Sequence, residues 1–263
     1  MKIRRIDYKY ADMWVLAAWT LFTTAFVLYV DPRPYVSTFL YFVLPTFYLF
    51  LRHKLNAKKI VLGSLLTGIM IPLPFDFLSY FNKAWFVPQE QLLIPLRFFN
   101  LNPVDELVWF FVAALYVITF YESFVDDERV VRLSRRFFKS LCFWASIIGV
   151  VFLIFFLWPG LLKVSYPYLT LWALASCPPI FVLFYKRPQF AGKVLLAAVF
   201  FFFVSLNFEL TAVHLGQWGF AGQYIGTVTL LGVTFPFEEF FYWILLYPAT
   251  IISYYELFVD DGR

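Results

Sequence analysis

Eight apolar stretches of about 20 residues each dominate the sequence and limit what the chain can fold into. A helix of that length spans the hydrocarbon core of a bilayer, because it rises about 1.5 Å per residue. Hydrophobic residues make up 62% of the chain, whereas soluble domains are about half apolar, so a soluble fold is excluded. We therefore expect an all-α integral membrane protein with about eight transmembrane helices. The stretches lie near Met13–Val30, Tyr35–Leu51, Ile60–Tyr80, Val104–Phe124, Phe138–Trp158, Tyr166–Tyr185, Phe190–Leu210 and Glu239–Phe258.

The basic residues divide unevenly between the two sides of this eight-span arrangement. One side carries 17 of the 21 Lys and Arg residues, and the other side carries only Arg33, Lys83, Arg97 and Lys163. Basic residues favour the cytoplasmic side, so we expect a multi-pass protein of the cell membrane with both termini in the cytoplasm. The net charge of +4 reflects this topology, and no basic patch suggests nucleic-acid binding. The 17 residues are Lys2, Arg4, Arg5, Lys9, Arg52, Lys54, Lys58, Lys59, Arg129, Arg132, Arg135, Arg136, Lys139, Lys186, Arg187, Lys193 and Arg263.

A pattern of acids, tryptophan and proline occurs twice, 133 residues apart and without a gap. The similarity continues to Tyr121–Asp127 and Tyr255–Asp261, after one inserted residue. Each unit holds four spans, and an even number gives both copies the same orientation. We therefore predict two tandem four-helix repeats in parallel orientation, residues 1–128 and 129–263, related by an axis along the membrane normal. The first copy contains Asp76, Trp85, Pro103, Asp105 and Glu106, and the second contains Glu209, Trp218, Pro236, Glu238 and Glu239.

The motif acids are expected to meet at one depth. Asp76 lies about one turn from the end of the third span, and Glu106 lies about one turn inside the antiparallel fourth span. Glu209 and Glu239 repeat this placement in spans seven and eight. An ionisable group inside a span costs about 2.5–3.5 kcal/mol and usually faces the protein interior. The duplicated placement therefore predicts a functional cluster.

A purely structural role is the alternative for the acids that follow Pro103 and Pro236. Proline suits the first turn of a helix, and acids there stabilise the positive end of the helix dipole. This alternative does not account for Asp76 or Glu209, because the dipole opposes an acid at the C-terminal end of a helix. The pairs Asp126–Asp127 and Asp260–Asp261 are interpreted as solvated helix ends, and a metal–diphosphate site there is the less favoured alternative.

Two outer segments, Phe81–Asn102 and His214–Phe235, connect the paired spans and are too apolar for ordinary loops. We expect them to lie in the membrane interface or to fold back and cap an apolar pocket. The glycines of the second segment do not form a dinucleotide fingerprint, because no strand or soluble βαβ unit precedes them. No flavin, nicotinamide or other cofactor is therefore expected.

The duplicated acid, Trp and Pro-x-acid-acid arrangement resembles the membrane-embedded lycopene cyclases. This family occurs as two small subunits in some bacteria and as one fused chain in archaea and fungi. The matching residues are Pro236-Phe237-Glu238-Glu239-Phe240-Phe241 and Pro103–Phe111, within 76–111 and 209–243, about a quarter of the chain. Asp105 departs from the pattern, because a Glu is expected there. The shorter side chain puts the carboxyl placement of the first repeat in doubt.

The resemblance implies an intramolecular lyase or isomerase that closes ionone-type rings on lycopene. A proton is delivered to the terminal C1=C2 bond, the C5=C6 bond attacks the cation, and a proton then leaves the ring. Consecutive helical residues point about 100° apart, so we expect Glu106 and Glu239 to face the reaction, with Asp76 or Glu209 opposite. No metal is expected. The candidate acid–base groups are Glu239, Glu106, Glu209, Asp76, Glu238 and Asp105, and the candidate substrate-binding aromatics are Trp85, Trp218, Trp109, Tyr242, Trp243 and Phe110.

Two other functions remain open. Parallel repeats with intramembrane acids also suit a proton-coupled transporter, although the scarcity of Ser, Thr, Asn and Gln in mid-helix favours a hydrophobic substrate. A non-catalytic carotenoid- or lipid-binding subunit would have the same pocket. The expected partners are lycopene or a related acyclic carotenoid, membrane lipid, and other enzymes of carotenoid biosynthesis.

Overall fold

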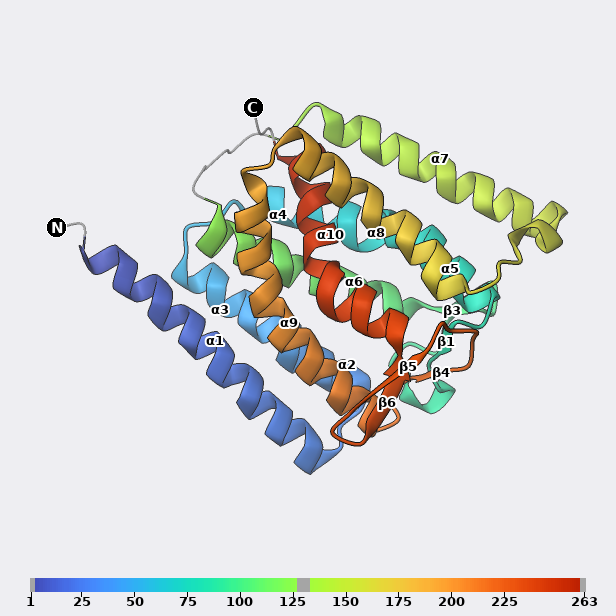
Figure 1. The fold of residues 1–263 in the computed structure, drawn as a ribbon, viewed down its shortest axis with the longest axis horizontal. Helices are drawn as coiled ribbons and strands as arrows, with labels where there is room; N and C mark the ends of the chain where they lie inside the picture. The colour runs from blue at the N-terminus through green and yellow to red at the C-terminus, as the bar shows by residue number, and fades with distance from the viewer. Residues whose placement is uncertain (1–2, 127–132, 261–263) are drawn as a thin grey trace.

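The computed structural model describes residues 3–126 and 133–260, with side chains from Tyr10 onward (Figure 1). The predicted boundary between the two halves, at 128–129, lies outside the described residues, as do Asp127 and Asp261. The helices are α1 (Ile3–Val30), α2 (Pro34–Thr38), α3 (Leu44–Arg52), α4 (Ala57–Leu65), α5 (Pro72–Phe81), α6 (Val104–Phe120), α7 (Arg136–Leu157), α8 (Pro167–Lys186), α9 (Phe190–His214) and α10 (Tyr247–Tyr254). Short strands are β1 (Trp85–Phe86), β2 (Arg97–Phe98), β3 (Asn102–Pro103), β4 (Gly219–Phe220), β5 (Thr227–Leu230) and β6 (Val233–Pro236).

Seven helical segments within the described ranges are long and apolar enough to cross a membrane, which indicates an α-helical integral membrane protein. They confirm the first seven predicted spans as helices. The segments are Tyr10–Val30, Pro34–Arg52, Ala57–Phe81, Val104–Val125, Arg136–Leu157, Pro167–Lys186 and Phe190–His214.

The eighth predicted span, Glu239–Phe258, is helical but differs from the other seven. It consists of a π-helical segment, Glu239–Leu246, then α10, then a second π-helical segment, Tyr255–Val259. Every residue of α10 is buried, and α10 packs against α6, α8 and α9 in the middle of the molecule. A helix surrounded by other helices can carry several tyrosines, because protein groups rather than lipid surround them.

Prolines explain three of the π-helical segments. Each of the segments 39–43, 66–70 and 239–246 ends two residues before a proline, at Pro45, Pro72 and Pro248 respectively. Proline lacks an N–H group, and its ring clashes with the carbonyl group four residues earlier. The preceding turn therefore widens, while the helix continues as one transmembrane unit.

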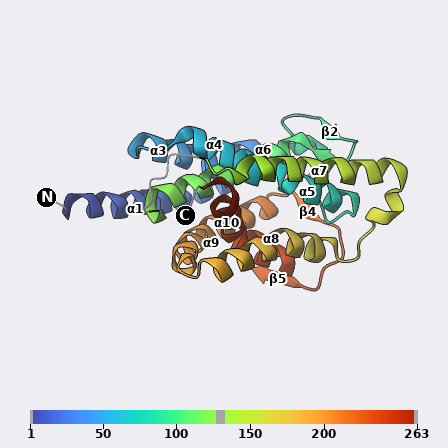
Figure 2. The same ribbon diagram turned by 90° about the horizontal axis from the view of Figure 1, so that it is seen from above.

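The outermost helices are α1 and α7, which lie at opposite edges of the bundle (Figure 1). Helix α1 packs against α9, and α7 packs against α5. Only 22% of the α1 span and 11% of the α7 span are buried, so most of their apolar surface faces outward, as expected for contact with lipid. Figure 2 shows α3 to α6 along one side of the molecule and α8 and α9 along the other.

The close approach of the third span to α6 requires glycine at position 68. A Cβ atom on Gly68 would lie 2.7 Å from the carbonyl oxygen of Phe110, which is shorter than a van der Waals contact. Glycine therefore allows the two helices to touch backbone to backbone. This contact holds α5, which follows in the same span, beside the start of α6.

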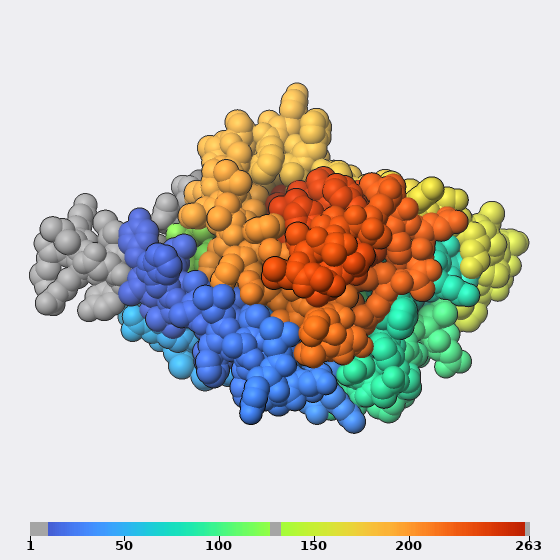
Figure 3. Space-filling model, turned by 60° about the horizontal axis from the view of Figure 1, so that its bottom comes forward, coloured from blue at the N-terminus to red at the C-terminus, as the bar shows by residue number. Residues whose placement is uncertain are grey.

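All described strands belong to the two outer segments, which form an ordered cap at one end of the bundle. Strand β1 pairs antiparallel with β4, and β5 pairs with β6 in a hairpin. Figure 3 shows the two segments, green and orange to red, side by side at this end. The hydroxyl of Tyr224 accepts a 2.8 Å hydrogen bond from Gly222 N and donates one to Ala84 O. Burial raises the pKa of Tyr224 to about 12, so this donor stays protonated at neutral pH.

Candidate active site

Strand β3 runs directly into α6, and strand β6 runs directly into the helical segment that begins the eighth span. Each acid pair therefore occupies a first helical turn. The two members of each pair point in different directions. Asp105 turns toward the first outer segment and accepts hydrogen bonds from Leu93 N (2.5 Å) and Ile94 N (3.1 Å). Glu238 accepts a 2.8 Å hydrogen bond from Ile225 N in the second outer segment. The first acid of each pair therefore anchors a backbone segment.

The second acid of the first pair, Glu106, meets two groups of α5. The hydroxyl of Tyr80 donates a hydrogen bond to Glu106 Oε2. Asp76, one turn earlier on α5, is fully buried and lies close enough to Glu106 for electrostatic interaction. Asn102 Nδ2 donates a 2.6 Å hydrogen bond to Asp76 Oδ2, which ties this carboxyl to β3.

The second acid of the second pair, Glu239, has similar surroundings. Tyr168, at the start of α8, donates a 2.5 Å hydrogen bond to Glu239 Oε2. The carboxyl group of Glu209 lies directly beside that of Glu239. Glu209 Oε1 also accepts a 3.1 Å hydrogen bond from Trp218 Nε1. Glu106 and Glu239 in turn interact electrostatically, so the four acids form one connected group.

A cavity of about 530 Å³ lies between the two carboxyl pairs. This volume falls within the range of about 300–1,000 Å³ that is usual for small-molecule sites. Ten of the twelve predicted site residues line the cavity. Asp76 and Glu238 do not line it: Asp76 is fully buried and bonded to Asn102, and Glu238 points toward Ile225 N. The ten residues are Glu106, Glu209, Glu239, Asp105, Trp85, Trp109, Trp218, Tyr242, Trp243 and Phe110.

The aromatic residues of the lining contact one another across the two halves of the chain. The rings of Trp109 and Trp243 lie 4.6 Å apart, and the rings of Trp85 and Tyr168 lie 5.0 Å apart. Ring faces attract positive charge, by about 0.5–2 kcal/mol per contact. The cavity therefore combines an aromatic wall with a small number of carboxyl groups.

The sequence prediction missed several residues of the site, notably Tyr80, Tyr168 and Trp172. A signal for the last two was present: Pro34-Tyr35 and Pro167-Tyr168 begin spans two and six at the same 133-residue offset as the acids. Phe39 and Trp172 are separated by the same offset. The side chains of Tyr35, Phe39, Tyr168 and Trp172 all line the cavity. Tyr80 has a valine, Val213, at its equivalent position, so the repeat could not reveal it.

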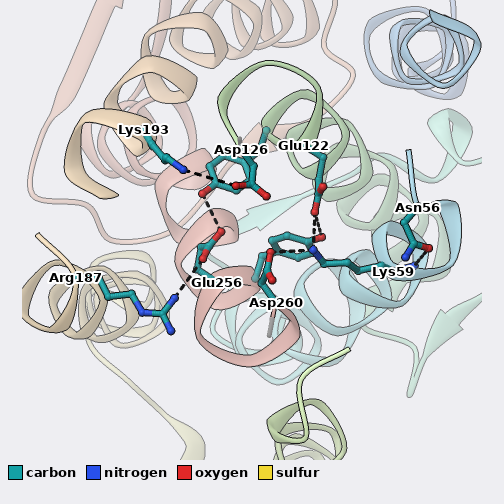
Figure 4. Close-up of polar contacts among 10 residues, drawn as sticks. Asn56, Lys59, Glu122, Asp126, Arg187, Lys193, Glu256 and Asp260 are labelled. Carbon is teal, nitrogen blue, oxygen red and sulfur yellow. Dashed lines mark hydrogen bonds and ion pairs between the residues drawn. The ribbon is translucent and has the colours of Figure 1, made fainter. Parts of the chain in front are cut away.

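A second charged cluster lies at the other end of the bundle (Figure 4). Lys59 Nζ lies 3.0 Å from Glu122 Oε1 and 2.8 Å from Asp260 Oδ2. Asp260 is 5% exposed, so the prediction of solvated helix ends is wrong for this residue. The reason is that its carboxylate pairs with a buried lysine. The carboxyl groups of Glu122, Asp126 and Asp260 are close enough together to hold a metal ion, but the Lys59 ammonium already lies between two of them.

Comparisons with known proteins do not identify the chain. No family model matches the sequence, and neither a curated protein nor a solved structure matches it.

Proposed function

We propose that the protein is a membrane-embedded carotenoid cyclase that closes rings on the acyclic ends of lycopene without a cofactor. The observation that carries this proposal is that the carboxyl pairs Asp76–Glu106 and Glu209–Glu239 adjoin one aromatic cavity. Ring closure needs a proton donor, a proton acceptor and a water-poor surface that stabilises a cation. The residues around the cavity include groups suited to each of these roles.

In the proposed reaction, a carboxylic acid adds a proton to the terminal C1=C2 bond and leaves a tertiary cation at C1. The electrons of the C5=C6 bond form the new C1–C6 bond, and the charge moves into the ring. A carboxylate then removes a ring proton, so one proton enters, one leaves, and no electrons are exchanged. Two adjacent carboxyl groups in a dry site do not both ionise, because like charges repel strongly there. We assign the donor role to a protonated member of a pair and the acceptor role to an ionised one.

The tyrosines give the two carboxyl pairs a fixed orientation in this scheme. Tyr80 and Tyr168 each donate a hydrogen bond to one oxygen of Glu106 and Glu239, respectively, which fixes the direction of each carboxyl group at the cavity. Catalytic groups held by hydrogen bonds need little reorganisation during the reaction. Tyr80 and Tyr168 are therefore proposed as positioning residues.

The proposed architecture is two parallel four-helix repeats with both termini in the cytoplasm, in the cell membrane. Reciprocal contacts between the halves support the repeat: Tyr121 donates to Glu256, and Tyr255 donates to Glu122. Lys59 of the first half pairs with Asp260 of the second half. Conversely, Lys193 of the second half lies 3.6 Å from Asp126 of the first half. A two-fold pseudo-symmetric arrangement produces contacts in such exchanged pairs.

The direct test is expression in a host that accumulates lycopene, followed by pigment analysis. The proposal predicts that lycopene is consumed and that products of equal mass with one or two rings appear. Loss of conversion in Glu239→Gln, with conversion retained in the exposed Glu90→Gln control, would tie the activity to the site. Lycopene that is bound but unchanged would indicate a binding subunit. If lycopene is neither bound nor converted, the result favours the transporter alternative and contradicts the proposal.

A further inference from the structure

The exposed part of the cavity lining, among the described residues, lies in one half of the chain. Among the residues of its lining, the four exposed large side chains are Tyr35 (40%), Phe39 (47%), Leu93 (57%) and Val108 (49%). They come from the second span, the first outer segment and the start of α6. All four belong to the first half of the chain, and together they surround the opening.

The equivalent side in the second half is closed. Tyr168 and Trp172, which correspond to Tyr35 and Phe39, are 4% and 9% exposed. The ring of Trp172 stacks on Phe110 at 5.7 Å and lies 6.0 Å from Trp85. Phe241, which corresponds to Val108, is 37% exposed but does not line the cavity. The two halves therefore share one cavity, and the exposed part of its described lining belongs to the first half.

The side chains around the entrance are suited to contact with lipid. Its residues are apolar or aromatic, and three of them, Tyr35, Phe39 and Val108, lie within helical segments of membrane-spanning length. The inner wall is formed by buried aromatic residues, including Trp243 and Tyr247. A molecule that enters from the bilayer therefore reaches the carboxyl groups without passing through water, and the described inner wall stops it there.

We propose that the opening bounded by Tyr35, Phe39, Leu93 and Val108 is a lateral portal that admits one end of a long apolar chain from the bilayer. This inference rests on the proposed function, because it takes the chain to be a linear carotenoid. The end group enters first and reaches both carboxyl pairs, while the rest of the chain stays in the portal and the lipid. The cavity then processes one end at a time. A second ring requires the molecule to leave and re-enter with its other end.

The portal is tested with a variant that narrows it and a matched variant at the equivalent position outside the cavity. Val108→Trp places a large ring at the opening, and Phe241→Trp places the same ring on the outer surface of the second half. Each protein is reconstituted into phosphatidylcholine vesicles and mixed with vesicles that contain lycopene. Both the bound lycopene and the conversion are followed over time.

Val108→Trp is expected to slow lycopene uptake by about tenfold, with a smaller effect on the conversion of lycopene already bound. Phe241→Trp is expected to behave like the wild type. Phe39→Trp, which introduces the residue found at the equivalent Trp172 position, provides a second narrowed portal if Val108→Trp does not fold. Equal uptake by the wild type and a folded narrowed variant would overturn the portal.

Two further outcomes separate the portal from the proposed function. If the wild type takes up lycopene but does not convert it, the cyclase function fails and the uptake rates alone decide on the portal. If it neither takes up nor converts lycopene, both proposals fail. Where conversion occurs, a product with one ring should appear free in the acceptor lipid before any product with two rings. Release of the two-ring product without that intermediate would contradict processing of one end at a time.

Discussion

The hydroxyl group of Tyr168 donates a 2.5 Å hydrogen bond to Glu239 Oε2, although the two residues are 71 positions apart in the sequence. This bond joins the start of α8 to the first turn of the last helix at the wall of the cavity. Both residues are buried, so the bond holds the carboxyl group where water does not compete. Glu239 thus has one oxygen fixed by Tyr168 and the carboxyl of Glu209 beside it.

Replacement of Tyr168 by Phe tests whether this bond positions the acid. Hydrogen bonds to charged groups contribute about 1.5–3 kcal/mol, so turnover is expected to fall by about 10–150-fold. Tyr29→Phe, at a 90% exposed position outside the cavity, is the control and should have little effect. The measurement is the pH profile of lycopene turnover per folded protein, because a positioning role should change the profile while a purely structural role should not. An unchanged turnover rate and pH profile in Tyr168→Phe would contradict the proposed positioning role of Tyr168.

The outer cap depends on the first acid of each pair. Glu238→Ala removes the acceptor for Ile225 N and leaves that part-buried N–H group unpaired, at a cost of about 1–3 kcal/mol. Hydrogen exchange in residues 214–235 should therefore accelerate, while Glu90→Ala, an exposed acid of the other outer segment, should not affect it. Unchanged exchange in this segment would show that Glu238 does not hold the cap.

Lys59 connects the two halves at the end of the bundle opposite the cap. Lys59→Met leaves the part-buried carboxylate of Glu122 and the buried carboxylate of Asp260 without their common partner, and breaking a buried ion pair costs about 3–5 kcal/mol. The neighbouring Lys58 is exposed, so Lys58→Met is a matched control. The free energy of unfolding in detergent should fall for the first variant alone. Equal stability of the two variants would show that this cluster does not hold the halves together.

Membrane orientation is tested at the two ends of the bundle. Reporter fusions at Arg135 should read as cytoplasmic, and fusions at Gln89, which is exposed in the outer cap, should read as external. Fusions that report the same side would contradict the proposed topology.

Much of the helical framework follows from the sequence, because apolar length alone determines where a chain can cross a bilayer. The direction of each acid pair also follows, because residues i and i+1 diverge by about 100° on a helix. Glu106 and Glu239 face the cavity, and Glu238 points away from it toward Ile225 N. Asp105 also lines the cavity, but its carboxylate accepts hydrogen bonds from backbone N–H groups. The catalytic roles of these acids remain predictions.

Other parts of the site could not be predicted because they depend on how the helices pack. The bond from Tyr80 to Glu106 requires the close approach of the third span to α6 that Gly68 allows. The pairing of Lys59 with Asp260 joins residues 201 positions apart. Strands β1 and β4 of the cap pair across the two halves, which periodicity within either outer segment does not reveal.

The most direct test of the proposed function is lycopene consumption per folded protein in Glu239→Gln and Glu106→Gln. Glutamine keeps the size of the side chain but cannot donate or accept the proton. We predict a fall of about 10²–10⁴-fold, as is typical on loss of a general acid or base, with unfolding stability at least equal to that of the wild type. Glu239→Gln should be the more damaging change, because Asp105 breaks the motif in the first repeat. Near-normal consumption in both folded variants would contradict acid catalysis by these residues.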